Sequence, residues 1–228
     1  MLGDVAVSDS SRCRSDGFLA NIGPREFSSL AYKIEKLGTR KSFVRNEEVY
    51  GDGEEVDYFF KIVSGAVRAY KIAFDGRRLV SAFYLPGDIF GFDVSNHHLF
   101  STEAIVKTEV IRVKRHTIMS LAEQDIKLAK DLWGVTADEL QRTQSHLLML
   151  NKSAPERVAG FLLEMAERIE EDEFQLVMCR QDVADYLGLT SETISRMLTR
   201  LQTSSTIDLP SCRRLVLRDR PVLNQMLT

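Results

Sequence analysis

The sequence is poor in cysteine, and no two of its cysteines stand at a motif spacing. Cys13, Cys179 and Cys212 are odd in number and far apart, which favours reduced thiols over a disulfide framework. No apolar run approaches the roughly 18 residues of a membrane-spanning helix. The start, MLGDVAVSDSSRCRSDG, lacks the basic and apolar regions of a secretion signal. These absences predict a cytoplasmic chain without a membrane partner.

Charge of neither sign predominates. The chain has 30 Lys and Arg against 33 Asp and Glu, a net charge of −3, which argues against a protein that coats nucleic acid non-specifically. The charges are nevertheless segregated. Acidic residues cluster in EMAERIEEDE, residues 164–173, whereas the last part of the chain is rich in arginine: Arg196, Arg200, Arg213, Arg214, Arg218 and Arg220. A local phosphate-facing surface requires such a pattern.

The length and composition are those of a globular protein with two domains. The chain has 228 residues, of which 44% are apolar and 28% charged. Residues 1–24 are polar and end at a Gly-Pro breaker, so we expect a flexible arm there. Residues 25–116 contain short β-rich runs divided by turn signals, which predict a β-roll or jelly roll. Within it, Asp75-Gly76 suits the type I′ turn of a hairpin.

The hydrophobic period changes near Thr117, and no proline follows until Pro155. This predicts one long helix over residues 117–151 with two apolar stripes. One stripe has coiled-coil spacing and consists of Ala129, Trp133, Thr136, Leu140, Thr143, Leu147 and Leu150. The other, Leu121, Leu128, Leu132 and Val135, suits packing on the helix's own domain. We expect a dimerisation helix whose interface includes Trp133, Leu140, Leu147 and Leu150; the alternative is a helix packed only within its own chain.

Residues 152–228 predict a winged helix-turn-helix domain. A helix begins at Pro155, where a missing N–H is harmless, and a two-helix motif and the strand-like RRLVLRD follow. In RQDVADYLGLTSETISRMLTRLQ, Ala184 is small where two helices cross, and Gly188 stands at the turn, where a left-handed conformation is needed. Thr190 or Ser191 is expected to cap the second helix.

The exposed face of that second helix has side chains that can read bases. Arg196 can donate two hydrogen bonds to guanine, Glu192 can accept from cytosine N4, and Ser195 can reach a base edge or a phosphate. The alternative is that Glu192 and Arg196 simply form a solvated pair at i,i+4. Further candidates for contact with double-stranded DNA are Arg180, Thr190, Ser191, Thr199, Arg200 and Arg213.

The segments SGAVR (64–68), LPGDIFGF (85–92), SAPERVAGFLLEMAER (153–168) and YLGLTSETISR (186–196) resemble signatures of the CRP/FNR family of bacterial regulators, in its FixK-like branch. The resemblance implies an α+β chain: a β-roll like that of cyclic-nucleotide-binding proteins, a long dimerisation helix and a C-terminal winged helix. It also implies a homodimeric activator that works with RNA polymerase on genes for microaerobic respiration or nitrogen fixation.

By the same resemblance, Glu192, Ser195 and Arg196 match the family's E-x-x-S-R motif, which reads TTGA half-sites of a palindrome. Ser191 stands where relatives often have an apolar residue that contacts a thymine methyl.

Cyclic-nucleotide binders have Gly-Glu and a later Arg-Ser or Arg-Thr pair to hold the ribose and phosphate. Here Phe92 follows Gly91, and HHLFSTEAIV contains no arginine, so we expect no cyclic nucleotide.

Other cofactors are not expected either. Oxygen-sensing relatives bind an iron–sulfur cluster through four cysteines, mostly near the N terminus, where this chain has only Cys13. His97-His98 could serve as metal ligands, but a surface loop is the preferred interpretation. No catalytic arrangement argues for an enzyme. The alternative function is a regulator that senses an unidentified small molecule in the β-roll.

Cys179 is the expected cap of the first helix of the motif, where Ser or Thr is usual. A thiol near the positive end of a helix and beside Arg180 favours the thiolate, the form that oxidants attack. The pattern therefore makes Cys179 a redox candidate, and an ordinary thiol is the alternative.

Overall fold

The computed structural model describes residues 28–93 and 95–227. The predicted arm 1–24 and Cys13 lie outside the described residues. The described part begins with α1 (Ser28–Leu37) and continues into strands β1 (Thr39–Phe43), β2 (Glu48–Tyr50), β3 (Tyr58–Ser64), β4 (Val67–Ile72), β5 (Arg78–Tyr84), β6 (Ile89–Phe90), β7 (Ser101–Ala104) and β8 (Thr108–Lys114). The β-rich part is followed by helices, as the sequence predicted.

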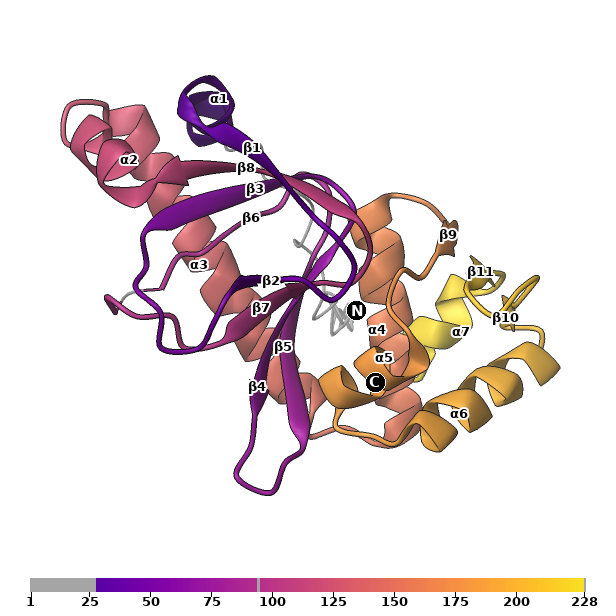
Figure 1. Ribbon diagram of the computed structural model, residues 1–228. Coiled ribbons are helices and arrows are strands. Elements are labelled where there is room, and N and C mark those ends of the chain that lie inside the picture. Colours follow the sequence, from indigo (N-terminus) through magenta and orange to yellow (C-terminus); the bar gives the residue numbers. More distant parts are fainter. Residues whose placement is uncertain (1–27, 94, 228) are drawn as a thin grey trace, which may run out of the picture.

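These strands form two four-stranded antiparallel sheets, in the orders β1-β8-β3-β6 and β2-β7-β4-β5 (Figure 1). Alternate side chains of both sheets, among them Phe43, Phe60, Val67 and Phe90, are buried in one core. The β4–β5 hairpin is confirmed. Its turn is not type I′, because of its residues only Gly76 has a positive φ, +82°, whereas type I′ needs two.

The predicted single helix over 117–151 is wrong. The structure has two helices, α2 (Arg115–Ala122) and α3 (Ile126–Met149). Asp125 between them is extended, with φ −122°, and its carboxylate accepts hydrogen bonds from the backbone N–H groups of Lys127 and Leu128 at 3.0 and 3.2 Å. A short acidic side chain that satisfies these otherwise free N–H groups starts a new helix without any proline.

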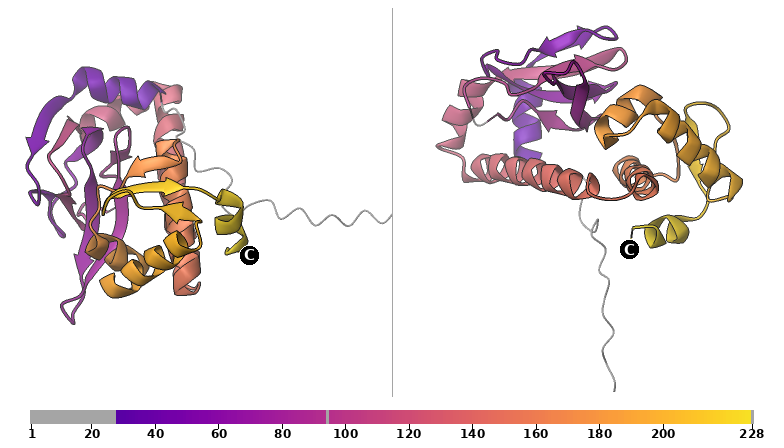
Figure 2. Two further views of the ribbon diagram at one scale, coloured as in Figure 1. Left: turned by 90° about the vertical axis from the view of Figure 1, so that its right-hand side faces the viewer. Right: turned by 90° about the horizontal axis from the view of Figure 1, so that it is seen from below.

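Helix α3 runs along one side of the β-roll (Figure 2). Three residues of the predicted inner stripe lie on α3: Leu128 and Val135 are buried in one cluster with Leu30 and Ile34 of α1, and Leu132 is partly buried there. Leu121, the fourth, packs on the same cluster from α2. Asp131 strengthens this contact, because its Oδ2 accepts the backbone N–H groups of Ser29 and Leu30 at 2.9 and 3.0 Å. The roll, α1 and α3 therefore form one unit.

The C-terminal part consists of α4 (Ala154–Ile169), β9 (Glu173–Gln175), α5 (Arg180–Leu187), α6 (Ser191–Thr203), β10 (Ile207–Asp208), β11 (Arg214–Leu217) and α7 (Arg220–Gln225). Strands β10, β11 and β9 form a small antiparallel sheet beside the helices, which is the predicted wing. A capping box between Ser153 and Glu156 starts α4. Within the described ranges, no helix is long and apolar enough to cross a membrane.

The core of this part continues into the roll. Ala66, Val80, Phe83 and Ile105 of the roll belong to the same buried cluster as the inner faces of α4, α5 and α6. Figure 1 shows α5 lying against the β4–β5 hairpin. The two predicted domains therefore share an apolar contact.

Candidate nucleic-acid interface

Helices α5 and α6 form the predicted helix-turn-helix. Gly188 ends α5 in the left-handed conformation, with φ +62°, which residues with a Cβ rarely adopt. Of the two expected caps, Thr190 is the one observed, and its Oγ1 accepts the backbone N–H of Thr193 at 3.2 Å. Ala184 is fully buried in the apolar cluster that α5 shares with α4 and α6. The packing and the turn between α5 and α6 therefore depend on Ala184, Gly188 and Thr190, which the sequence analysis had singled out.

Helix α6 presents one polar face to solvent. Its buried side is Ile194, Leu198 and Leu201, and the exposed side consists of Glu192, Ser195, Arg196, Thr199 and Arg200. The hydroxyl of Ser195 donates to the Ser191 carbonyl at 2.9 Å, and Arg196 Nη2 donates to Thr193 Oγ1 at 3.2 Å. The structure therefore brings the three predicted base-reading residues onto one accessible surface.

Glu192 is held as a carboxylate. Its own backbone N–H, the hydroxyls of Thr190 and Ser191, and the charge of Arg196 lower its pKa below the ordinary value. An ionised carboxylate only accepts hydrogen bonds. In a major groove it is suited to an amino group such as N4 of cytosine.

The arginines around α6 differ in whether they form ion pairs within the protein. Arg214, Arg218 and Arg220 form ion pairs with Glu173, Asp208 and Asp172 of the same C-terminal part. The arginine-rich stretch is therefore not uniformly free to meet phosphate. Local acidic side chains, from the cluster noted in the sequence and from β10, neutralise part of it. Arg196 and Arg200 remain exposed on α6.

Two flanking candidates face the body of the protein. Arg180 Nη2 donates to the carbonyl of Cys212 at 3.3 Å and so ties α5 to the wing. Arg213 is half-buried and lines a cavity beside the N terminus of α5. Both residues lie near the motif. Residue spacing alone did not reveal that Arg180 bonds the wing or that Arg213 lines a cavity.

Cys179 is the N-cap of α5 and is half-buried. Its backbone N–H and its thiol both donate to Asp182 Oδ2, at 3.2 and 3.1 Å. The expected guanidinium neighbour is not Arg180, whose side chain turns to the wing. A cavity of about 230 Å³ beside the thiol is instead lined by four other arginines, Arg45, Arg68, Arg78 and Arg213.

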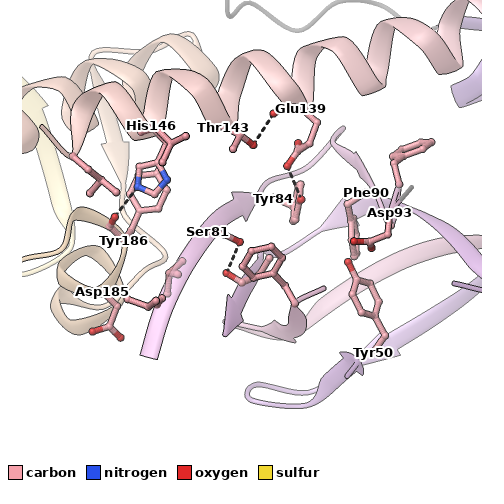
Figure 3. Close-up of a pocket in the computed structure, with 18 of the residues that line it drawn as sticks. Tyr50, Ser81, Tyr84, Phe90, Asp93, Glu139, Thr143, His146, Asp185 and Tyr186 are labelled. Atoms are coloured by element: carbon pink, nitrogen blue, oxygen red, sulfur yellow. Dashed lines mark hydrogen bonds between the residues drawn. The ribbon is translucent and has the colours of Figure 1, made fainter. Parts of the chain in front are cut away.

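A larger cavity, of about 430 Å³, lies between the roll, α3 and α5 (Figure 3). Its walls include Tyr50, Tyr84 and Phe90 from the roll, facing Glu139 and His146 of α3, and Tyr84 Oη donates to Glu139 Oε1 at 3.1 Å. Of the described residues that line it, none is Lys or Arg. An anionic phosphate would therefore find no cationic side chain there.

The histidine pair is not simply a surface loop. His97 is exposed, but His98 is buried, stacks on Tyr50 at 3.6 Å between ring centroids, and lies 2.6 Å from Asp93 through Nδ1. The preferred surface loop therefore holds for His97 but not for His98, whose burial the spacing did not indicate. In the described part of the chain, no group of three His, Cys, Asp or Glu side chains converges as a metal site.

Two family models match the chain. The model described as a cyclic nucleotide-binding domain matches residues 40–125, and the Crp-like helix-turn-helix domain matches residues 156–226. The first covers most of the roll and α2, and the second covers the motif and the wing.

Known proteins match over most of their length. The nitrogen fixation regulation protein FixK of Azorhizobium caulinodans is 45% identical over 203 residues, which are 86% of this chain and 82% of that protein. FixK of Rhizobium meliloti is 40% identical, over 73% of this chain and 76% of its own. The solved structure of FixK2 from Bradyrhizobium japonicum superposes with a TM-score of 0.81 at 41% identity and covers 84% of this chain and 98% of that one.

Proposed function

Because this chain belongs to the CRP/FNR family of transcription regulators, in its FixK-like branch, we propose that it binds a palindromic DNA site as a homodimer and activates transcription there. The observation that carries the proposal is the exposed face of α6 with Glu192, Ser195 and Arg196. Side chains of these types, projecting from a recognition helix, can distinguish base pairs in the major groove.

Each residue has a role in reading a TTGA half-site. Arg196 donates to O6 and N7 of the guanine, Glu192 accepts from N4 of the cytosine paired with it, and Ser195 contacts a base edge or a phosphate. Thr199 and Arg200 on the same face, and Thr190 and Ser191 at the start of α6, are accessible to the phosphates of a bound duplex. Arg180 and Arg213 contribute from the side of the wing.

Dimerisation uses the outer stripe of α3. Trp133, Leu140 and Leu147 are 77%, 59% and 58% exposed on one face of that helix, and such apolar area is costly to leave in water. A second copy of α3 covers it by coiled-coil packing. Leu150 is half-buried and closes the end of the stripe. Two recognition helices then bind two half-sites together, which multiplies affinity.

No cyclic nucleotide or iron–sulfur cluster is needed for this activity. The described residues that line the 430 Å³ cavity include no Lys or Arg, which supports a regulator that does not respond to nucleotide phosphates. Oxidation of Cys179 is a second means of control, because a new negative charge would arise at the N terminus of α5. The names of the FixK relatives support target genes of nitrogen fixation. Genes of microaerobic respiration are proposed as further targets, and at these genes the dimer contacts RNA polymerase.

The cavity also favours a second candidate function. A ligand in it would touch the roll, α3 and α5 at once, so a small uncharged or cationic aromatic molecule would be an effector. A ligand selective for the folded chain raises its melting temperature. A thermal-shift series with such compounds distinguishes this function from effector-independent binding.

A selection of bound sequences from random duplex DNA tests the main proposal. We expect a palindrome with half-site centres about 34 Å apart, one helical turn of DNA, and a guanine fixed in each half. Enrichment of a single asymmetric site, or of no sequence, would contradict it.

A further inference from the structure

The roll and α5 are joined by buried ion pairs. Arg68 of β4 contacts Asp182 of α5 through Nη1 at 2.8 Å and Glu103 of β7 through Nη2 at 2.6 Å. Arg68 is 7% exposed and Asp182 is 1% exposed. Interactions between charges removed from water are strong and directional, because solvent screens them little.

Arg78 of β5 adds a second connection. Its Nη2 lies 2.7 Å from Asp182 Oδ1, and its Nε donates to Asp185 Oδ2, also at 2.7 Å. Asp182 and Asp185 stand three residues apart, so both carboxylates lie on the side of α5 that faces the roll. Arg68, Arg78, Glu103, Asp182 and Asp185 are called the interdomain ion-pair network below.

Much of the remaining contact between α5 and the roll is apolar. Val80 and Phe83 of β5 pack into the cluster that contains Tyr186 and Leu187 of α5, and the rings of Phe83 and Tyr186 are tilted, with centroids 5.2 Å apart. Apolar packing is non-directional, so it allows one element to slide or rotate over another. A guanidinium that bridges two carboxylates resists such movement, because its hydrogen bonds have a fixed geometry. Helix α4 is held separately by Arg168, whose Nη2 donates to Asp88 Oδ2 at 2.5 Å and to the Phe83 carbonyl at 3.0 Å.

We propose that Arg68 and Arg78 are positioning residues for DNA recognition, which fix the angle between the helix-turn-helix and the roll and thereby the half-site spacing that the protein accepts. The inference rests on the proposed binding of a palindrome by a dimer. The roll and α3 form one unit, and α3 provides the dimer axis. The orientation of α5 on the roll therefore determines the separation of the two α6 helices, although neither arginine belongs to the base-reading face.

The experiment measures binding of the full chain to four duplexes: the selected palindrome, the same palindrome lengthened by one or by two base pairs at its centre, and a single half-site. The variant Arg78→Gln removes the bridge and keeps much of the side-chain length. Arg77→Gln is the matched control, because Arg77 is the adjacent residue, is exposed, and pairs with Asp75 in the hairpin turn, away from α5. Asp185→Asn removes the partner of Arg78 from the side of α5.

The wild type and Arg77→Gln are expected to prefer the natural spacing by at least about a hundredfold. Arg78→Gln and Asp185→Asn should reduce this ratio about tenfold and bind the single half-site as the wild type does. Circular dichroism checks that each variant is folded. If one of the two is unfolded, the spacing preference is measured with the other.

An unchanged spacing ratio in the folded variants would overturn the inference. Equal loss on all four duplexes, including the half-site, would also overturn it, because it would indicate a direct phosphate contact by Arg78 or general damage to the motif. If the wild type prefers no palindrome, the proposed function itself is contradicted. The wild type is measured first, so this outcome is recognised before any variant is compared.

Discussion

The imidazole of His146 in α3 stacks on the phenol ring of Tyr186 in α5, with ring centroids 4.0 Å apart and planes 9° from parallel. Its Nε2 lies 2.7 Å from the carbonyl oxygen of Tyr186. This contact joins the proposed dimerisation helix directly to the first helix of the DNA-binding motif. Burial lowers the pKa of His146, the backbone contact opposing the shift, and burial raises the pKa of Glu164, which lies 3.5 Å from the Tyr186 hydroxyl.

The first prediction concerns pH. Because the folded state disfavours the charged imidazole, His146 contributes its full stability above the unfolded pKa of about 6.5, and this contribution is lost as the pH falls below that value towards the lower folded pKa. Melting temperatures between about pH 8 and pH 5 should therefore fall more steeply in the wild type than in His146→Gln.

Glu164 acts in the opposite direction, because its raised pKa makes its ionisation destabilising as the pH rises above about 4.5. Comparing the wild type with His146→Gln cancels that contribution, since Glu164 is present in both. His116 is exposed at the start of α2, so His116→Gln is the control and should keep the wild-type slope. Equal slopes in wild type and His146→Gln would show that His146 does not titrate between the two states.

The second prediction concerns Arg196. Arg196→Ala should cost about 1–3 kcal/mol at each half-site and relax the preference at one guanine, because it removes two hydrogen bonds to that base. Arg200→Ala, one turn along the same exposed face, should instead weaken binding to all sequences alike. Competition assays with specific and random duplexes measure both. Equal losses on the two duplexes for Arg196→Ala would assign Arg196 to phosphate only.

A third prediction separates Glu192 from the arginines. Because its lowered pKa keeps it an acceptor, Glu192→Ala should change which base pair is preferred at one position of each half-site and leave non-specific affinity nearly unchanged. A repeated selection from random DNA reads this out. The same consensus from both proteins would remove Glu192 from the base-reading set.

The motif was predictable because its determinants are local. Gly188 and Thr190 specify the turn and the cap through their own backbone and side chain, and the apolar spacing of Ile194, Leu198 and Leu201 specifies the buried face. The outer stripe of α3 was predictable for the same reason. Local patterns also place Cys179 at its cap.

The break before α3 and the interdomain ion-pair network could not be predicted in this way. Asp125 is compatible with a helix interior as well as with a cap, so its residue type alone does not decide between them. Arg68 and Asp182 are 114 residues apart, and Arg78 and Asp182 are 104 apart. Hydrophobic periodicity carries no information about which distant charge a buried arginine meets.

The fourth prediction tests the dimer. Leu140→Glu should yield monomers that bind the palindrome poorly, because a charge buried in a coiled-coil seam without a partner is costly and the two half-sites act together. Gln141→Glu introduces the same charge at the next, exposed position of α3 and should remain dimeric. Sedimentation velocity measures both. A dimeric Leu140→Glu with normal affinity would place the interface elsewhere.

The last prediction concerns Cys179. Peroxide converts an accessible thiol to sulfinic acid, and the sulfur lies 3.1 Å from Asp182 Oδ2, so oxidation would place two anions in contact at the N-cap of α5. The capping box would open, and Asp182 would be displaced from Arg68 and Arg78. We expect the affinity of the wild type for its palindrome to fall about tenfold, roughly 1.4 kcal/mol, after peroxide.

Cys179→Ser should retain its affinity after the same treatment, because serine is a good N-cap and is not oxidised. The matched control is Cys212→Ser, since Cys212 is the other described cysteine and is exposed in the wing; it should remain as sensitive to peroxide as the wild type. Mass spectrometry identifies the oxidised residue in each sample, and fluorescence anisotropy with labelled duplex gives the affinity. If Cys179→Ser loses binding as readily as the wild type, the redox-sensitive group lies elsewhere in the chain, and the opening of the capping box is not the cause.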